Sequence, residues 1–534
     1  MMDILESRYY NPADMASVLL INPSYLRTYG TSPAAAMNPV FPVLGLAALG
    51  AAVRARGHRP EILDLSYQPY DPASLREIIG SRRPDFVGIT ATTPLVNQLR
   101  DLSFLIKDIS NDIVTIAGGP HASALPVETL RESRIDILVA GEGDTVFPDI
   151  VDGKPLDALP GVYWRRGDTI VESPARTLVG NLDDLPLPAW DLFPIDAYRR
   201  RYSKVLVRNP PPCTVEFSRG CLFGCDYCTS KNTMGFGHRR KSPERCADEF
   251  EALEKLGYRE ALLTDDIFTS NRAWAIQVCE AIIRRNLKMV WTCTNGIRVD
   301  SATDELFRVM RRAGCYRVHF GFESGNDRVL KAFGKGGKAS LAQGMAAVDA
   351  SRKAGLDTWG MYMLGLSADD EASMRDTIDF AKRTNVDVAK FSICIPFPGS
   401  KMFDKLHREG KIKTYDWDEY NVANEVSAVC EHPTLSWDTI RAYYRKAYTE
   451  LYLANPRYVL RRLWRSVRRG EIFSDIWLGL GFVFQIAKRP QPALEITYGY
   501  KDKWQPLNVV PPMHQTYVVP KVEIRRTAPD QDRA

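Results

Sequence analysis

Residues 218–228 read Ser-Arg-Gly-Cys-Leu-Phe-Gly-Cys-Asp-Tyr-Cys and place Cys221, Cys225 and Cys228 on one short stretch with the spacing C-x3-C-x2-C. Three thiolates this close together can hold three corners of a cubane iron–sulfur cluster. Since no fourth ligand lies nearby, one iron would stay open to a small molecule. The spacing therefore predicts a cluster that takes part in chemistry rather than one that only passes electrons.

A zinc site is the alternative for the same cysteines. A C-x2-C pair often belongs to zinc, but zinc sites usually bring a second pair at a regular distance, which this chain does not show. His238 lies ten residues beyond Cys228 and is the candidate for a fourth zinc ligand. Gly220, Gly224 and Phe223 favour a tight loop wrapped around a cluster instead. We expect the cluster, and zinc remains the second interpretation.

After the cysteines, short apolar strands alternate with helical segments. We expect strands at residues 214–217, 260–264, 289–293, 316–322, 357–363 and 389–394. This alternation predicts a partial (β/α)6 barrel with a parallel sheet over residues 213–412. Barrels of this kind carry their sites at the carboxyl ends of the strands. Polar residues follow the predicted strands there, among them Asp265, Asp266, Asn295, Arg298, Glu323 and Ser324.

The N-terminal third shows the same alternation. Five short apolar strands are expected, at residues 17–24, 61–65, 85–90, 113–119 and 135–143. They predict an α/β domain with a doubly wound, Rossmann-like parallel sheet. Ligands of such sheets lie beyond the carboxyl ends of the strands, where Gly118, Gly119 and Gly141 would let a bulky ligand approach the backbone. Because no G-x-G-x-x-G run follows the first strand, a dinucleotide is not expected.

The C-x3-C spacing, followed by an aromatic residue and a third cysteine, resembles the signature of the radical S-adenosylmethionine (radical SAM) superfamily. The resemblance implies that Cys221, Cys225 and Cys228 bind a [4Fe–4S] cluster whose open iron chelates SAM. It also implies that the reduced cluster cleaves SAM to a 5′-deoxyadenosyl radical. By the same resemblance, Tyr227 packs near the adenine and the G-x-E-S-G match at residues 321–325 borders SAM.

Six residues are expected to contact SAM: Tyr227, Asp265, Asn295, Arg298, Glu323 and Ser324. Their carboxylates can accept from the ammonium or the ribose hydroxyls, the guanidinium can pair with the SAM carboxylate, and the amide and hydroxyl can add hydrogen bonds. The superfamily's G-G-E run appears here as Thr-Asp-Asp at residues 264–266, so the carboxylate that binds the ammonium stays open. The alternative is that Asp265, Asp266 and Arg298 form ion pairs at the barrel mouth.

Residues 15–150 resemble the cobalamin-binding domain that precedes some radical SAM barrels. The residues expected at cobalamin are Pro42, Thr92, Gly118, Gly119, Pro120, His121, Gly141 and Glu142. The D-x-H-x-x-G motif, whose histidine ligates cobalt in the cobalamin mutases, is absent after the first strand. We therefore expect cobalamin without a histidine on cobalt. His121 could touch the corrin or its tail, but it is a poor match for the axial ligand.

Composition limits the function classes. The chain has 534 residues, 45% hydrophobic and 25% charged, and a net charge of +5 gives no reason to expect a nucleic-acid partner. All ten cysteines lie at or after Cys213, which is unlike an extracellular disulfide framework. The first residues show no basic stretch followed by an apolar core, so no signal peptide is expected. These features favour the cytoplasm.

Two further regions complete the predicted organisation. Residues 151–212 are rich in proline and turns and are expected to form a connector. Residues 413–524 read as mostly helical, with six arginines in 457–469 and an apolar stretch at 476–487 that is too short to cross a bilayer. This region either closes the barrel or contacts a membrane surface, which would favour a lipid substrate. Residues 525–534 are expected to be disordered.

Three functions remain open from the sequence. The first is a cobalamin-dependent radical SAM enzyme that methylates an unactivated carbon of a small natural-product or lipid-type substrate. The second keeps both cofactors without methyl transfer, because the chain also resembles the anaerobic magnesium-protoporphyrin IX monomethyl ester cyclases, which carry out oxidative ring formation. The group that the chain resembles also includes phosphinate methylases, which fit the first function. The third is a non-catalytic cobalamin-binding or zinc-binding protein. For an enzyme, the superfamily implies flavodoxin or ferredoxin as the electron donor.

Overall fold

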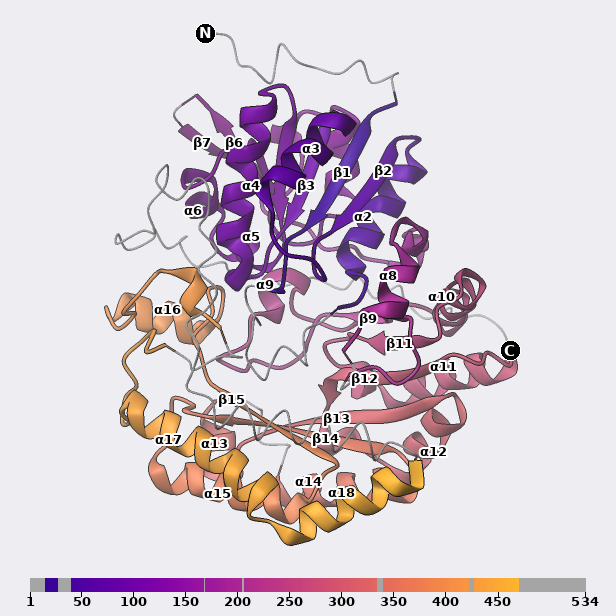
Figure 1. The fold of residues 1–534 in the computed structure, drawn as a ribbon, viewed down its shortest axis with the longest axis vertical. Helices are drawn as coiled ribbons and strands as arrows, with labels where there is room; N and C mark the ends of the chain where they lie inside the picture. Colours follow the sequence, from indigo (N-terminus) through magenta and orange to yellow (C-terminus); the bar gives the residue numbers. More distant parts are fainter. Residues whose placement is uncertain are drawn as a thin grey trace, which may run out of the picture.

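The computed structural model describes residues 15–26, 40–167, 169–203, 206–333, 340–421 and 427–469. Two sheets dominate it, one from the N-terminal part of the chain and one from its middle, and they lie one above the other along the long axis (Figure 1). This arrangement confirms the predicted α/β class. The apolar stretch at 476–487 and the tail at 525–534 lie outside the described residues.

The N-terminal sheet has the strand order β2-β1-β3-β4-β5-β6-β7. The strands are β1 (Ser17–Asn22), β2 (Arg59–Asp64), β3 (Phe86–Thr90), β4 (Val114–Gly118), β5 (Ile137–Val139), β6 (Val162–Arg166) and β7 (Thr169–Glu172). The first five pair in parallel, as the doubly wound prediction requires. The antiparallel hairpin β6–β7 then extends the sheet beyond β5, so part of the expected connector belongs to this sheet.

Helices cover both faces of this sheet because its strands are apolar on both sides. The helices and 3-10 turns are α2 (Leu44–Ala55), α3 (Pro72–Arg82), η2 (Thr93–Leu95), α4 (Val96–Ile109), α5 (Pro120–Ala124), α6 (Pro126–Arg131), α7 (Val146–Val151) and η3 (Leu156–Ala158). Leu20 points to the face that packs against α2 and α7. Its neighbours Leu19 and Ile21 point to the opposite face, against α3 and α4.

The second sheet has the order β15-β14-β13-β12-β11-β8, and all its pairings are parallel. Its strands are β8 (Pro212–Val215), β11 (Glu260–Leu263), β12 (Val290–Ile297), β13 (Cys315–Glu323), β14 (Asp357–Leu364) and β15 (Val388–Ile393). A small antiparallel pair, β9 (Ser218–Arg219) and β10 (Arg239–Arg240), lies beside it. The predicted six-stranded partial barrel is confirmed.

Helices form the outer layer of the barrel and begin at residues that cap them. They are α9 (Ser230–Met234), α10 (Pro243–Leu256), η6 (Phe268–Ser270), α11 (Arg272–Arg284), η7 (Val299–Ser301), α12 (Asp304–Arg312), α13 (Asp327–Ala332), α14 (Leu341–Lys353) and α15 (Glu371–Thr384). Ser242 accepts from the Arg245 N–H at the start of α10, and Ser340 forms a capping box with Gln343 at the start of α14.

The connector touches both units. It contains η4 (Leu182–Asp184), η5 (Trp190–Leu192) and α8 (Ile195–Arg200), and η5 lies between α2 and α10. Residues 206–211 then close the amino-terminal end of the barrel. Arg317 Nη1 donates to the Leu206 carbonyl at 3.0 Å, and Arg208 Nη2 pairs with Asp357 Oδ2 at 2.9 Å. The opposite, carboxyl end of the barrel is left for the site.

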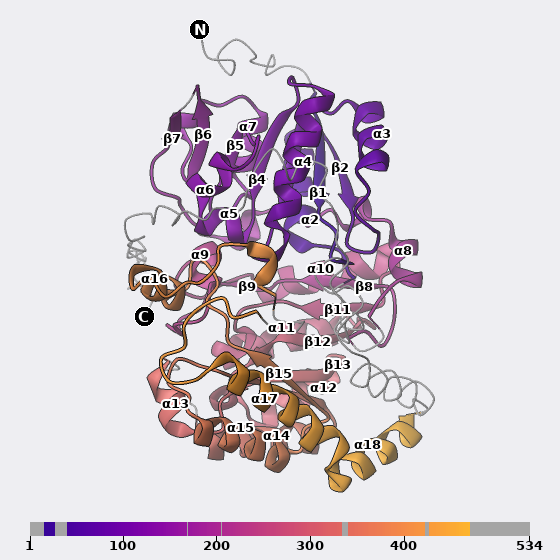
Figure 2. The same ribbon diagram turned by 60° about the vertical axis from the view of Figure 1, so that its left-hand side comes forward.

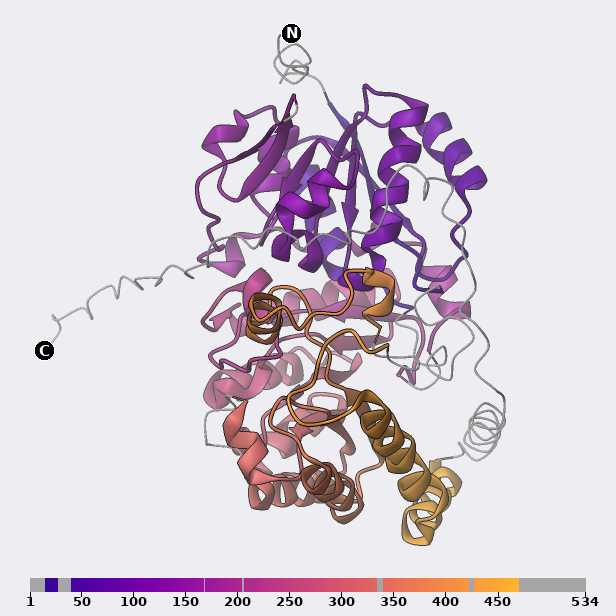
Figure 3. The same ribbon diagram turned by 90° about the vertical axis from the view of Figure 1, so that its left-hand side faces the viewer.

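The C-terminal segments cover the edge of the barrel. They are α16 (Lys401–Arg408), η8 (Trp417–Glu419), α17 (Trp437–Tyr448), the π-helical turn η9 (Thr449–Leu453) and α18 (Pro456–Arg469). Strand β15 is the edge of its sheet, and the hydroxyls of Tyr448 and Tyr452 bond the backbone of Phe391 and Ala389 on it. Figures 2 and 3 show α16 and η8 between the two units and α17 and α18 along the barrel. The edge is therefore satisfied by side chains.

No helix among the described residues has both the length and the apolarity needed to cross a membrane.

Candidate active site

The cysteine loop lies at the carboxyl end of the barrel, between β9 and α9. Gly220 begins it with φ +85°, and a Cβ there would lie 2.9 Å from the Gly237 carbonyl oxygen, so only glycine fits this turn. The loop is held from two sides. Asp226 N–H donates to the Phe333 carbonyl at 3.2 Å, and Met402 N–H donates to the Asp226 carbonyl at 2.8 Å.

The three cysteines differ from the others in exposure. Cys221, Cys225 and Cys228 are half-buried, whereas the remaining seven cysteines are fully buried. Burial raises the pKa of the Cys228 thiol to about 11 and also raises the pKa of Cys221. Metal binding requires thiolates, so a bound cluster would displace these protons. The donor set, three accessible thiols on one loop, fits three corners of a cubane.

His238, the candidate fourth zinc ligand, is held through one ring nitrogen. Its Nδ1 bonds Ser270 Oγ at 2.8 Å, and its ring lies edge-on to Trp274 with centroids 5.9 Å apart. The other ring nitrogen, Nε2, is buried without a well-formed hydrogen bond. Among the described residues no three His, Cys, Asp or Glu side chains, the three loop cysteines included, converge closely enough to hold a metal ion, and this applies equally to zinc and to a cluster.

Asp265 and Asp266 point in opposite directions because side chains alternate along the end of β11. Asp265 faces the helix layer, where it accepts from Phe217 N–H at 2.8 Å and from the Ser218 hydroxyl, and burial raises its pKa to about 8. Its carboxyl is thus used to fix the turn that leads into the cysteine loop. Asp266 faces the barrel, and its Oδ2 is buried without a hydrogen-bond partner.

The cysteine loop carries further buried polar atoms without partners. Ser230 Oγ and Asn232 Nδ2, both on α9 directly after the cysteines, make no well-formed hydrogen bond, like Asp266 Oδ2. Burial raises the pKa of Asp266, and the nearby Ser230 hydroxyl opposes that rise. Buried polar groups are normally paired, so a group of orphans at one place indicates a missing ligand. The sequence analysis missed Ser230 and Asn232 as site residues. No signal in the sequence marks them apart from their position after Cys228.

Asn295 and Arg298 lie at the end of β12. Asn295 is exposed at the mouth, and its Nδ2 donates to the Thr264 carbonyl at 2.5 Å. Arg298 forms two hydrogen bonds with Asp300, at 2.9 and 2.8 Å, and its guanidinium lies 3.7 Å above the ring of Phe223 in the cysteine loop. The ion-pair alternative thus applies to Arg298. Its stacking on Phe223 also lets it support the cysteine loop.

Tyr227 and Glu323 lie together at the mouth. Tyr227 packs edge-on against Phe333, with ring centroids 5.6 Å apart. Burial, and after it the negative charge of Glu323, raises the pKa of the Tyr227 hydroxyl. Glu323 has φ +63°, an uncommon conformation for this residue at the end of a strand. Strain of this kind collects at functional sites, in agreement with the expectation that Glu323 contacts a ligand.

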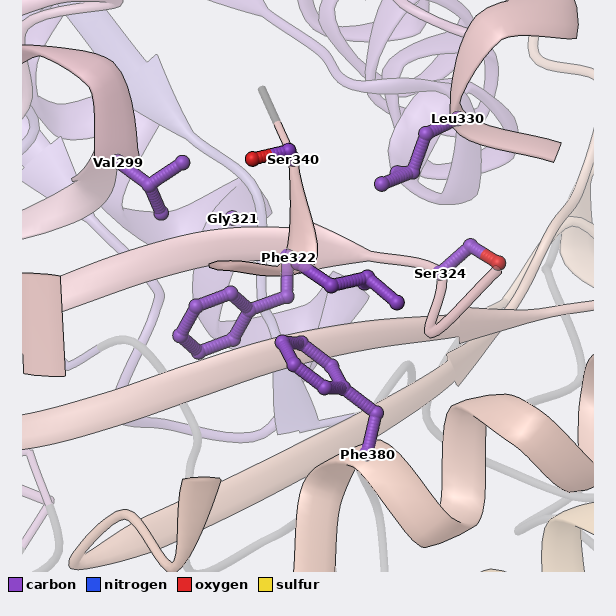
Figure 4. Close-up of a pocket in the computed structure, with 8 residues that line it drawn as sticks. Val299, Gly321, Phe322, Ser324, Leu330, Ser340 and Phe380 are labelled. Carbon is purple, nitrogen blue, oxygen red and sulfur yellow. The ribbon is translucent and has the colours of Figure 1, made fainter. Parts of the chain in front are cut away.

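Ser324 turns away from the barrel interior. Its hydroxyl is fully buried and lies 3.3 Å from Thr377 Oγ1 on α15. It lines a cavity of about 10 Å³ between β13 and the helices, where Phe322 and Phe380 lie below it (Figure 4). That volume holds no more than one water molecule. The Ser324 hydroxyl therefore fixes the turn after β13, and only its backbone remains near the mouth.

The glycines expected at cobalamin lie at the carboxyl edge of the N-terminal sheet, which faces the barrel. Gly119 has φ +94°, and a Cβ there would lie 2.6 Å from Thr90 Oγ1. At Gly118 the nearest atom would be 3.7 Å away. Thr92 and Pro120 are exposed beside them, and Pro42 accepts from the Thr214 hydroxyl at 2.5 Å through its carbonyl. This edge offers open backbone to a flat ligand.

His121 is buried and committed to other partners. Its Nδ1 lies 3.2 Å from Thr93 Oγ1, its Nε2 lies 3.4 Å from Glu128 Oε2, and its ring packs edge-on against Trp417. Burial also lowers its pKa. Trp417 Nε1 donates to Glu128 Oε1 at 3.0 Å, so this group joins η8 to the N-terminal sheet. In this arrangement His121 has no open nitrogen for cobalt.

A buried charge network joins the two units next to the cysteines. Arg219, two residues before Cys221, forms two hydrogen bonds with Asp144, at 2.8 and 3.0 Å, and one with Glu216 at 2.6 Å. Glu142 pairs with Arg239 at 2.6 and 2.9 Å. Glu142 was expected at cobalamin, but its carboxylate is occupied by these contacts. Sequence reasoning missed Arg219 and Asp144 because the pair spans the two domains.

Two family models match the chain. The model "Radical SAM superfamily" matches residues 215–381, and the model "B12 binding domain" matches residues 33–151. The first covers the cysteine loop and most of the barrel, and the second covers most of the N-terminal sheet.

The relatives cover most of the chain. An uncharacterized methyltransferase of Pyrococcus horikoshii is 32% identical over 84% of this chain and 93% of the relative. The anaerobic magnesium-protoporphyrin IX monomethyl ester cyclase of Rubrivivax gelatinosus is 26% identical over 77% of this chain and 73% of the relative. The cytidylyl-2-hydroxyethylphosphonate methyltransferase of Streptomyces wedmorensis is 25% identical over 74% and 82%.

One solved structure shows the same arrangement. The radical S-adenosylmethionine methyltransferase TsrM from Kitasatospora setae, with cobalamin and a [4Fe–4S] cluster bound, superposes with a TM-score of 0.62 at 19% identity. The match covers 74% of this chain and 78% of that protein. At this identity the likeness concerns the fold.

Proposed function

Since the chain belongs to the radical SAM superfamily and carries a B12 binding domain, we propose that it transfers a methyl group to an unactivated carbon of a small natural-product or lipid-type substrate. The observation that carries this proposal is the placement of the cysteine loop. Arg219, two residues before Cys221, binds Asp144 directly after the glycine-rich end of β5. A corrin at that edge and a cluster on that loop would face one common space.

The three cofactors, a [4Fe–4S] cluster, SAM and cobalamin, together supply a hydrogen-abstracting radical and a transferable methyl group. The protein's part is to hold and orient them. Cys221, Cys225 and Cys228 would hold the cluster through three irons. Arg219 and Arg298 fix the loop on which these cysteines lie, the first from the N-terminal domain and the second from β12.

For SAM, we propose Asp266 rather than Asp265 as the carboxylate that accepts from the ammonium. Asp266 presents an unpartnered oxygen toward the barrel, whereas both oxygens of Asp265 accept from residues 217 and 218. Tyr227, Glu323 and the amide of Asn295 remain proposals for contacts with the rest of SAM. An amide or carboxylate at the mouth suits the ribose hydroxyls and the adenine.

For cobalamin, the proposal uses backbone rather than side chains. Gly118 and Gly119, with the exposed Thr92 and Pro120, form the edge on which the corrin would lie. Gly141 follows the neighbouring strand with φ +93°. His121 is buried and bonded to Thr93 and Glu128, so we propose that it would not serve as a ligand of cobalt.

Oxidative ring formation is the second candidate, because this chain is 26% identical to the Rubrivivax cyclase over 73% of that protein's length. SAM labelled with ¹³C in its methyl group separates the two. Anaerobic reactions with an extract of the source cells are expected to give a small molecule that carries the label. Release of 5′-deoxyadenosine with an unlabelled, oxidised product would replace methyl transfer by cyclisation.

Partners follow from this proposal. A low-potential donor such as flavodoxin or ferredoxin would reduce the cluster in the cytoplasm.

We also propose that α18 contacts the membrane surface, because Leu460, Leu463, Trp464 and Val467 form one exposed apolar face on an arginine-rich helix. Cosedimentation with anionic lipid vesicles tests this contact. W464E is expected to weaken it, and equal sedimentation of both proteins would refute it.

A further inference from the structure

The interior of the barrel contains a lysine that the proposed cofactors do not use. Lys390 lies in the middle of β15, between Ala389 and Phe391, both of which are buried in the apolar core on the helix side. Because side chains alternate along a strand, Lys390 faces the opposite side, the barrel interior. It is half-buried there.

The strands next to β15 place one flexible side chain beside Lys390. In the strand register, Lys390 pairs with Met361 on β14, and Met361 pairs with Gly321 on β13. Gly321 has no side chain, and the Met361 methyl reaches past it, since a Cβ at Gly296 on β12 would lie 2.7 Å from Met361 Cε. One step deeper, His319 stacks on Trp359 with ring centroids 4.7 Å apart. The row therefore has a lysine on one side, a flat layer beneath it and an adaptable methionine between the strands.

Lys390 has no partner among the described residues, neither a hydrogen bond nor an ion pair. Burial lowers the pKa of its ammonium, and no nearby carboxylate opposes that effect. A buried charge is normally paired, because leaving water without a partner is costly. An unpaired lysine that faces the interior of the barrel is therefore a candidate for contact with a ligand.

The other charges inside the barrel do not supply that partner. At the closed end, Asp357 pairs with Arg208, and Glu260 accepts from the Asn209 N–H at 2.6 Å and the Tyr316 hydroxyl at 2.6 Å. His319 is neutral, since burial lowers its pKa to about 3. Glu323, at the mouth end of β13, does not pair with Lys390 either, so no described carboxylate compensates the charge of Lys390.

Lys390 lies on a different part of the sheet from the residues proposed for SAM. Glu323, at the end of β13, is two strand spacings away, about 10 Å along the sheet, and Asn295, near the end of β12, is three, about 14 Å. Asp266 follows β11, one strand farther. The Lys390 ammonium therefore lies on the side of the barrel opposite Asp266, the proposed contact of the SAM ammonium.

We propose that Lys390 binds an anionic group of the substrate, a carboxylate or a phosphate, inside the barrel. The inference rests on the proposed function only in taking the barrel as the place where the substrate binds. Pairing with the ammonium fixes one end of the substrate deep in the barrel, so that the carbon to be modified points to the mouth, where the cluster loop lies. The protein then selects anionic substrates over neutral ones of the same shape.

The test compares the wild type with K390M and K390R, all loaded with cluster and cobalamin. K390M keeps the length of the side chain without the charge, and K390R keeps the charge. K255M, at an exposed lysine on α10, is the matched control. An anaerobic extract of the source cells is separated by anion exchange into retained and unretained small molecules. Methyl label from ¹³C-SAM and substrate-dependent release of 5′-deoxyadenosine are measured with each fraction.

With the wild type, K255M and the retained fraction, both readouts are expected to rise. In K390M they fall about 10- to 100-fold at subsaturating substrate, and K390R restores part of the effect. Iron content and visible absorbance confirm that K390M carries its cluster. Activity from the unretained fraction, or equal activity of K390M and wild type, overturns the inference.

The two proposals fail separately. If no fraction yields label but the retained fraction stimulates release of 5′-deoxyadenosine from the wild type and not from K390M, methyl transfer is wrong and the role of Lys390 stands. If label forms equally in K390M, methyl transfer stands and the role of Lys390 is wrong. If no fraction changes either readout, both are rejected.

Discussion

Asp265 and Asp266 are adjacent in the sequence but differ in role: Asp265 fixes the turn before the cysteine loop, and Asp266 is proposed to bind SAM. They follow the same strand, but one faces the helices and the other faces the barrel. Leu263 is buried on the helix side, so two residues later Asp265 lies on that side too, and Asp266 lies on the other. The alternation is visible in the sequence and would have assigned the two roles.

D266N is expected to weaken SAM binding about 10- to 100-fold, because the variant loses a charged acceptor for the ammonium. Equilibrium dialysis with SAM under anaerobic conditions measures the effect on cluster-loaded protein. D265N is the matched comparison, and its SAM affinity should stay within about threefold of the wild type's. A larger loss in D265N than in D266N would reverse the assignment.

D265N is also expected to change how stability depends on pH. Burial raises the pKa of Asp265 to about 8 from an ordinary value of 3.8, so folding takes up a proton between these values. The contribution of this group therefore falls as pH rises from about 4 to 8, by about 1.4 kcal/mol per pH unit. Urea unfolding at several pH values should show that the free energy of unfolding of D265N increases relative to that of the wild type as pH rises. Parallel plots of this free energy against pH would contradict a protonated Asp265 in the folded protein.

Among the elements, the strands were the most predictable part of this chain. Parallel strands covered on both faces read as continuous apolar runs, and each predicted strand of both sheets is present. The hairpin β6–β7 lies in the expected connector, and its pairing with β5 was not predicted, because pairing between strands is a long-range property. The direction of Ser324 toward α15 depends on the turn after β13, which local pattern does not encode.

The strand ends carry a prediction about cobalamin. G119A would place a Cβ 2.6 Å from Thr90 Oγ1 in a backbone conformation that alanine disfavours, so the edge of β4 must shift. We expect this variant to bind cobalamin at least tenfold more weakly, measured by retained visible absorbance after gel filtration. G80A, on α3 and outside the proposed corrin edge, is the control, since its Cβ would meet nothing within 4 Å. Equal retention of cobalamin by both variants would indicate that the corrin does not bind at this edge.

The contact between β9 and the N-terminal domain carries a prediction about stability. R219M leaves Asp144 and Glu216 buried without their partner, which typically costs about 3–5 kcal/mol. Arg54 forms an equally close two-bond pair with Asp191, but the side chains are 45% and 43% exposed. R54M should therefore cost about 1 kcal/mol or less. Equal losses of unfolding free energy in R219M and R54M, measured by urea unfolding, would show that the Arg219 network does not fix the cluster loop.

At the scale of the whole molecule, two stacked sheets direct their carboxyl ends toward one space. The cysteine loop enters that space from the barrel, and the glycines of β4 and β5 enter it from the N-terminal sheet. The order of domains could be predicted from sequence, since both sheets alternate strands and helices in series. The joining contacts could not, because Arg219 with Asp144 and Trp417 with Glu128 connect residues far apart in the chain.

The substrate class also belongs to this scale. Connector residues pack across the amino-terminal end of the barrel, so under the proposed function a substrate would enter from the mouth, past the proposed cofactors. A positive charge at depth would then select which molecules enter fully. This explains how one enzyme can present an unreactive carbon at the mouth while recognising a charged group elsewhere on the same molecule.

Electron paramagnetic resonance of the reduced protein, recorded with and without SAM, tests the central claim most directly. The account predicts four irons per chain and a cubane signal that shifts when SAM is added, because one iron has no protein ligand. C225A should lose the signal, and C279A, at a buried cysteine of α11, should keep it. A single tetrahedral metal ion at these cysteines, or a cluster signal that SAM leaves unchanged, would contradict the account.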